Sequence, residues 1–325
     1  MDGLLDLEVN LNLFFQSLGD WLTVPFQGIS MLATEYFFIF IIPLVYWCID
    51  ALMGLRMAFL LVISNSVNSF FKMIFHSPRP FWYNAEVKSL SQETSFGLPS
   101  GHSQNSASIY GVMATSVKKK GFTILILVVI FLVGLSRLYL GMHFLRDVLT
   151  GWLLGALCVA GFLWAEKRLS GWIAKRTLGM QILFSLLFAI VVILVAVAGK
   201  STSAQWMMPT TWIETAAATG GAVPDPFNIE GSITLAGVAF GFTAGYAGWV
   251  KKYGVPVVKG SALKRFARFF VGIVGVVVIY LGLKMVFPEE PILLGYVLRF
   301  LRYTLLSLWV SYIAPMLFKK LKLDE

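Results

Sequence analysis

The chain has 325 residues, of which 58% are hydrophobic and only 13% are charged, and its mean hydropathy is +0.77. Soluble domains carry about 25% charged residues, so this composition excludes an ordinary soluble enzyme. The net charge of +9 does not require a nucleic-acid partner, because basic residues also flank membrane spans. Cys48 and Cys158 lie in apolar runs, and only three histidines are present, which argues against a disulfide framework or a His-rich metal site. We therefore expect a multi-pass membrane protein.

Acidic and bulky apolar side chains alternate over residues 1–33. This pattern predicts an amphipathic helix that lies on the membrane surface rather than across it. No basic residue precedes Arg56, so the charged start of a cleavable signal peptide is not expected.

A membrane-spanning helix needs about 20 mostly apolar residues. The apolar runs predict an all-α bundle of nine spans, at about 35–54, 57–75, 102–117, 121–140, 144–166, 179–199, 231–250, 267–286 and 292–318. Seventeen of the 26 Lys and Arg residues fall on one side of such a bundle, and most acidic residues fall on the other. Because cytoplasmic loops are rich in Lys and Arg, we expect the N-terminus outside and the C-terminus in the cytoplasm.

The longest polar interruption is the predicted outer loop 200–230, which carries Trp206, Trp212 and Phe227. Two interpretations stay open, an interfacial loop or a lid over a neighbouring site. Near the outer end of the last span, Arg299 and Arg302 either extend to lipid headgroups or form a second contact for an anion.

Three polar clusters interrupt spans two to five. The first contains Asn65, Asn68, Ser69 and Lys72 on one helical face, followed by Arg79 and Pro80. Polar residues inside a membrane are costly and default to functional roles, although a packing seam explains the Asn and Ser residues, and Lys72 taken alone could extend to the interface.

The second cluster, Pro99-Ser100-Gly101-His102, precedes span three. Ser100 is a plausible helix N-cap, and a helix N-terminus offers free N–H groups to a phosphate. A plain helix cap with an interfacial histidine is the alternative.

The third cluster runs from Ser136 to Asp147. His143 and Asp147 are four residues apart, so on a helix they can touch, and the carboxylate would fix the imidazole tautomer and leave one ring nitrogen free. Arg137 offers a charged fork suited to phosphate oxygens, and a structural Arg–Asp pair is the alternative.

The order of the spans brings the three clusters to the same outer face. Lys72 and Arg79 end span two, Ser100 and His102 open span three, Arg137 ends span four and His143 opens span five. Together they predict a phosphate site with a His–Asp nucleophile and a second histidine placed as an acid.

These residues resemble the signatures of the type 2 phosphatidic acid phosphatase (PAP2) superfamily, KxxxxxxRP, PSGH and SRxxxxxHxxxD. The chain matches all three, as Lys72 with Arg79-Pro80, as Pro99-Ser100-Gly101-His102, and as Ser136-Arg137 with His143 and Asp147. The resemblance covers residues 55–166 and implies a catalytic membrane core at 34–166, after an interfacial segment at 1–33 and before additional helices at 167–325.

The resemblance also implies roles for these residues. His143 would attack phosphorus to form a phosphohistidine, Asp147 would orient it, and His102 would act as general acid and then base. Lys72, Arg79, Ser100, Gly101 and Arg137 would bind the phosphate, with no metal and no cofactor.

The expected layout, nine spans with the N-terminus outside, resembles the glucose-6-phosphatase and sphingosine-phosphate phosphatase branches of the superfamily more than its six-span lipid phosphatases. Glucose-6-phosphatases lack an Asp at the place of Asp147, and Phe81, Trp82 and Tyr83 suit a substrate with a tail in the bilayer. We therefore expect a lipid phosphate monoester or isoprenyl diphosphate as substrate, hydrolysed outside a bacterial inner membrane. A soluble sugar phosphate and a non-enzymatic lipid-binding or transport role are the alternatives, and the oligomeric state stays open.

Overall fold

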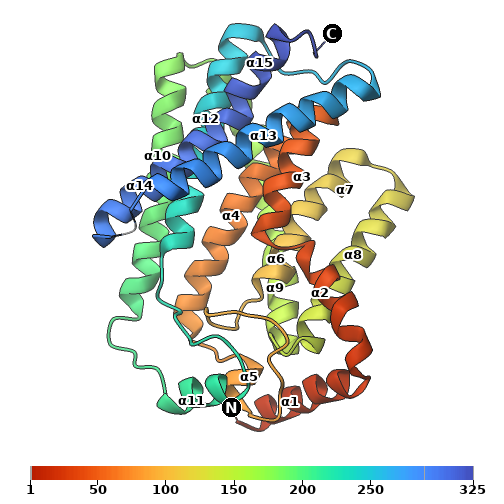
Figure 1. The fold of residues 1–325 in the computed structure, drawn as a ribbon, viewed down its shortest axis with the longest axis vertical. Coiled ribbons are helices and arrows are strands. Elements are labelled where there is room, and N and C mark those ends of the chain that lie inside the picture. Colours follow the sequence, from red (N-terminus) through yellow and green to blue (C-terminus); the bar gives the residue numbers. More distant parts are fainter. Residues whose placement is uncertain (1, 289, 325) are drawn as a thin grey trace. The chain divides into compact units, whose positions relative to one another are not determined.

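The computed structural model describes residues 2–288 and 290–324, without the side chains of Asp2 and Leu4. Those residues form helices joined by turns and longer irregular segments, with no strand, which confirms the expected all-α fold (Figure 1). The contacts divide the chain into two compact units, and unit 1 contains Met1–Phe38, Val67–Ala160 and Ala196–Asn228. Unit 2 contains Ile39–Ser66, Gly161–Val195 and Ile229–Glu325. Both units draw on segments from either side of residue 166, and the functional division at residues 33 and 166 stays a prediction.

The helices follow one another in chain order as α1 (Asp2–Ser17), η1 (Asp20–Leu22), α2 (Thr23–Met31), α3 (Glu35–Cys48), α4 (Ala51–Phe75), α5 (Pro80–Tyr83), α6 (Gly101–Asn105), η2 (Ser106–Tyr110), α7 (Gly111–Val117), α8 (Lys120–Tyr139) and α9 (Leu145–Ala174). They continue as α10 (Leu178–Thr202), α11 (Thr210–Ala218), α12 (Glu230–Tyr253), α13 (Ala262–Val286), α14 (Ile292–Leu308), η3 (Trp309–Ile313) and α15 (Ala314–Lys320). Here η1 is a 3₁₀ turn, whereas η2 and η3 are π-helical.

Within the described part of the chain, seven helical segments are long and apolar enough to cross a membrane. They are Ala51–Tyr83, Lys120–Tyr139, Leu145–Ala174, Leu178–Thr202, Glu230–Tyr253, Ala262–Val286 and Ile292–Lys320. A bent pair, Asp20–Met31 with Glu35–Cys48, brings the number to eight if it counts as one span. The expected count of nine is therefore approximate. The segment expected at 102–117 is made of α6, η2 and α7, and polar side chains occupy its N-terminal half.

Close helix packing in unit 2 depends on glycines spaced four residues apart on α12. A Cβ atom on Gly237 would lie 2.6 Å from the carbonyl oxygen of Phe300, and one on Gly241 would lie 2.2 Å from that of Thr304. Small residues at this spacing let two helix backbones approach each other in a membrane. These two glycines therefore allow the backbone of α14 to pack directly against α12.

The core of unit 1 is an aromatic cluster beside the three sequence motifs. Its fully buried members include Phe81, Trp82, Phe96, Tyr139 and Met142. The short helix α11 packs beside α5, as Figure 1 shows. Three aromatic residues of the predicted outer loop, Trp206, Trp212 and Phe227, pack against this core.

Candidate functional site

The turn between α8 and α9 carries the histidine that the third motif marks as nucleophile. Gly141, with φ of +71°, makes the turn possible, because a side chain there would be strained and its Cβ would lie 2.4 Å from the carbonyl oxygen of Lys88. His143 lies in this turn, and Asp147 lies in the first turn of α9. The two residues therefore do not stack along a helix as expected, yet they meet, with Nδ1 of His143 3.3 Å from Oδ2 of Asp147.

Hydrogen bonds fix the tautomer of His143. Its Nε2 is 3.2 Å from Nη1 of Arg79, and a guanidinium can only donate, so Nε2 accepts and carries no proton. The proton must then be on Nδ1, which donates to Asp147. The Asp147 carboxylate also accepts the backbone N–H of Phe144 at 3.0 Å. This arrangement leaves the lone pair of Nε2 directed at the cationic side of the site.

Burial lowers the pKa of the His143 imidazole, and the positive charges of Arg79, Lys72 and Arg137 lower it further. Both effects disfavour the imidazolium. His143 is therefore a neutral base near pH 7, the form that a nucleophilic nitrogen requires.

Arg79 is buried and connects the first motif to the third. Its Nε donates to the carbonyl oxygen of Ser95 at 2.6 Å, and its Nη1 donates to that of Met142 at 2.9 Å. Lys72 donates to Ser95 Oγ at 3.1 Å and to the carbonyl oxygen of Phe96. Only 8% of Lys72 is exposed, so it does not extend to a membrane interface.

Ser100 caps α6, as predicted, by accepting the N–H of Ser103. Its own backbone N–H donates to the carbonyl oxygen of Asp147 at 2.9 Å, which ties the second motif to the third. A Cβ on Gly101 would lie 3.3 Å from Oδ1 of Asn68, so this glycine permits a tight contact with α4. The expected phosphate-binding roles of Ser100 and Gly101 stay predictions.

Two arginines and a histidine of the site converge on Glu93, an acidic residue that belongs to none of the three motifs. Its carboxylate lies 3.1 Å from Nη2 of Arg137, 3.4 Å from Nη2 of Arg79 and 3.7 Å from Nδ1 of His102. Burial by itself raises the pKa of Glu93, but the charges of Arg79 and Arg137 outweigh this effect and lower it to about 2. Glu93 is thus ionised at neutral pH. The feature of the sequence that could have identified Glu93 is its position in the short segment between the first two motifs.

Helix α1 makes side-chain hydrogen bonds to the backbone of the third motif, and no pattern in the sequence predicted these contacts. Asn12 donates from Nδ2 to the carbonyl oxygens of Leu138 and His143, at 2.8 and 3.1 Å. Arg146, on α9, forms an ion pair with Glu8 of α1. Helix α2 adds Ser30, whose hydroxyl accepts from Nη1 of Arg137 at 2.6 Å. The N-terminal segment therefore holds the backbone and the arginine of the third motif.

The predicted outer loop contacts the segment that carries Glu93. The N–H of Asp225 donates to the carbonyl oxygen of Thr94 at 2.9 Å, and Gln92 donates to that of Gly220 at 3.2 Å. Trp206 stacks on His76, with ring centroids 4.6 Å apart. Whether this loop acts as a lid stays a prediction.

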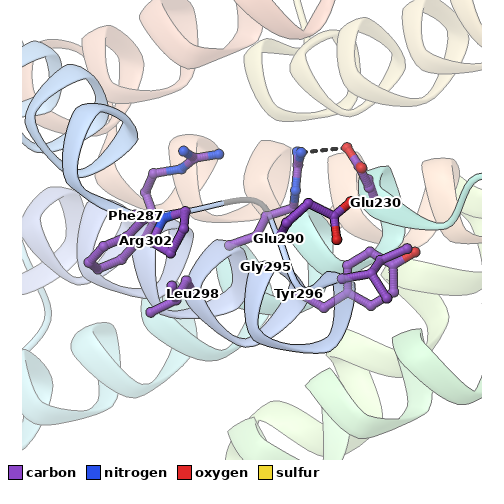
Figure 2. Close-up of a pocket in the computed structure, with 10 residues that line it drawn as sticks. Glu230, Phe287, Glu290, Gly295, Tyr296, Leu298 and Arg302 are labelled. Atoms are coloured by element: carbon purple, nitrogen blue, oxygen red, sulfur yellow. Dashed lines mark hydrogen bonds and ion pairs between the residues drawn. The ribbon is translucent and has the colours of Figure 1, made fainter.

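A separate cavity of about 120 Å³ lies in unit 2 beside the start of α14 (Figure 2). Arg299 pairs there with Glu230, the contact marked by the dashed line. Arg302 is buried and lies over the rings of Tyr280 and Tyr303. Over residues 2–288 and 290–324 no group of three His, Cys, Asp or Glu side chains is arranged to hold a metal ion.

Comparison with known proteins identifies two matching regions. Residues 53–170 match the PAP2 superfamily, and residues 233–325 match a family described as PAP2 superfamily phosphatase, transmembrane extension. The chain is 33% identical over 150 residues to phosphatidylglycerophosphatase B of Bacillus subtilis, covering 42% of this chain and 71% of the relative.

Two further proteins are similar to parts of this chain. The chain is 30% identical over 178 residues to glucose-6-phosphatase catalytic subunit 1 of Felis catus, covering 46% of this chain and 48% of that protein, so it spans about half of this relative. The crystal structure of a transmembrane PAP2-type phosphatidylglycerolphosphate phosphatase from Bacillus subtilis aligns with a TM-score of 0.45 and 28% identity, over 52% of this chain and 88% of that one. On the strength of the family match and the 33% identical relative, the chain belongs to the PAP2 superfamily and is a membrane-embedded phosphatase of that superfamily.

Proposed function

We propose that the protein hydrolyses a lipid phosphate monoester or an isoprenyl diphosphate through a phosphohistidine, without a metal, on the non-cytoplasmic side of the membrane. The observation that carries this proposal is the convergence of Arg79, Arg137 and His102 on one carboxylate, next to an unprotonated ring nitrogen of His143. Clustered N–H donors of this kind suit a phosphoryl group, whose charge is spread over its oxygens.

In the first proposed step, Nε2 of His143 forms a bond to phosphorus while the bond from phosphorus to the leaving oxygen breaks. His102 gives a proton to that oxygen, and the alcohol leaves. In the second step, water attacks phosphorus and gives a proton to His102, and the bond from phosphorus to Nε2 breaks to release orthophosphate.

The remaining charged side chains stabilise these steps without changing their own bonds. Arg79 and Arg137 hold phosphate oxygens, and Lys72 adds a third positive charge to the site. Asp147 stabilises the imidazole ring as it becomes positively charged on phosphorylation. Ser100 and the N-terminus of α6 complete the binding site for the phosphate.

A lipid substrate is supported by the similarity to a Bacillus subtilis phosphatidylglycerophosphatase. A soluble sugar phosphate is the second candidate, and it is supported by the similarity to a glucose-6-phosphatase. The apolar spans support residence in a membrane, and a bacterial inner membrane with the site facing outward is our proposal for its location.

The test is turnover by the purified protein in detergent with EDTA present. Phosphatidate, phosphatidylglycerophosphate, sphingosine phosphate, farnesyl diphosphate and glucose 6-phosphate are compared at equal concentrations. We expect release of orthophosphate from one or more lipid substrates, and inhibition by vanadate, which mimics five-coordinate phosphorus. Turnover of glucose 6-phosphate alone would reject the lipid proposal, and loss of all activity with EDTA would reject the metal-free mechanism.

A further inference from the structure

The Glu93 carboxylate contacts both arginines that the proposed function assigns to the phosphate. On Arg137, Nη1 donates to Ser30 and Nη2 donates to Glu93. On Arg79, Nε and Nη1 donate to backbone oxygens, and Nη2 faces Glu93 and Ser95. One N–H of Arg137 Nη2 is therefore directed at Glu93, and a phosphate that bound Arg79 and Arg137 together would lie against this carboxylate.

The backbone around Glu93 is held on both sides. The N–H of Leu90 donates to the carbonyl oxygen of Leu140 at 3.1 Å, and the carbonyl oxygen of Thr94 accepts from Asp225 at 2.9 Å. Phe96, three residues further on, is fully buried in the aromatic core. The Glu93 side chain itself is 24% exposed, so it is not enclosed on every side. With the backbone held, opening of the site would have to come from movement of the Glu93 side chain.

The charges of the Glu93 carboxylate and of the phosphate determine which of the two binds the arginines. The pKa of Glu93, about 2, keeps the carboxylate ionised at neutral pH, and a phosphate that entered beside it would meet an anion at contact distance. A carboxylate has two oxygens and one negative charge, whereas a phosphate monoester offers three terminal oxygens and up to two charges. The substrate can therefore displace Glu93, and Glu93 can return as the product leaves.

We propose that Glu93 is an intramolecular competitor of phosphate, which occupies Arg79, Arg137 and His102 in the resting enzyme and re-occupies them to expel orthophosphate. The inference rests on the proposed function, because it takes these side chains to be the phosphate site. Every ligand that must displace Glu93 then binds more weakly by one common factor, the fraction of protein in which the site is open.

The test compares Glu93→Gln with the wild-type protein and with Glu86→Gln, an exposed acid on the same segment. Binding of orthophosphate and of vanadate is measured by ligand-induced shifts in thermal unfolding, and KM and kcat are measured with the best substrate. If Glu93 fills the site nine-tenths of the time, Glu93→Gln tightens both dissociation constants and lowers KM by about tenfold. Glu86→Gln leaves all three values unchanged.

Other results overturn the proposal. Unchanged or weaker phosphate binding in Glu93→Gln, with a lower kcat, would make Glu93 a positioning residue for His102. If Glu93→Gln does not fold, Glu93→Asp serves instead, because its carboxylate is one methylene shorter on a fixed backbone and should also bind phosphate more tightly. The two binding assays need no turnover, so they decide the role of Glu93 even if no lipid phosphate proves to be a substrate.

Discussion

Replacing Asp147 with Asn tests the electrostatic role of this carboxylate with little change in shape. The amide oxygen of Asn can still accept the N–H of Phe144, now 3.0 Å from Asp147 Oδ2, and the Nδ1–H of His143. The change therefore preserves the His143 tautomer and removes one negative charge from a fully buried position.

The size of the effect follows from the geometry. With Nδ1 and Oδ2 3.3 Å apart, the centres of charge are about 4.5 Å apart, and at an effective dielectric constant of about 20 their attraction is roughly 4 kcal/mol. His143 is neutral in the resting enzyme and becomes positive only as phosphorus bonds to it. The loss therefore falls on the transition state, so kcat should drop roughly 10²- to 10³-fold while the affinity for orthophosphate, a ground-state ligand, stays nearly the same.

The assay is steady-state orthophosphate release, together with orthophosphate binding measured by ligand-induced shifts in thermal unfolding, with Asp225→Asn, at an exposed position of the segment 219–229, as the control. A decrease in kcat of less than about threefold would show that the charge does not act on the chemical step. An equal loss of kcat and of orthophosphate affinity would show that Asp147 supports the binding site rather than the nucleophile.

Three further substitutions test the nucleophile and its supports. His143→Ala should abolish turnover and leave a folded protein by circular dichroism, and substantial residual activity would refute the assignment of the nucleophile. Gly97→Ala places a Cβ 2.5 Å from the carbonyl oxygen of Pro78 and 3.0 Å from Oδ2 of Asp147, so it should lower unfolding stability by about 1–3 kcal/mol and reduce kcat; an unchanged melting temperature would contradict this. Asn12→Ala leaves two buried carbonyl oxygens without their side-chain donor and should cost about 1–3 kcal/mol, measured by thermal unfolding in detergent, whereas a neutral result would mean that water replaces the amide.

Segments that are distant in the sequence hold the charged residues of the site in place. Asn12 on α1 holds the carbonyl oxygen of His143, and Ser30 on α2 holds Arg137. Asp225 holds the backbone next to Glu93 from the other side. Each contact fixes a charged group or its backbone, as a preorganised phosphate site requires.

The amino-acid sequence alone was sufficient to predict the all-helical membrane fold and the superfamily, because both depend on local information. Apolar runs of about 20 residues predict spans wherever they occur, and the three motifs have fixed spacings around Arg79, His102 and His143. The sequence also indicated that Ser100 caps a helix, since capping involves residues only three apart.

Tertiary structure decided the features that join distant residues. Glu93 meets Arg137 across 44 positions of the chain, and Asn12 meets His143 across 131, so no local pattern reveals either contact. The turn at Gly141 places His143 outside α9, although its spacing from Asp147 suits a helix equally well. The physical reason is the same in each case: a buried charge or carbonyl group must find a partner, and the fold determines which distant side chain lies close enough to supply it.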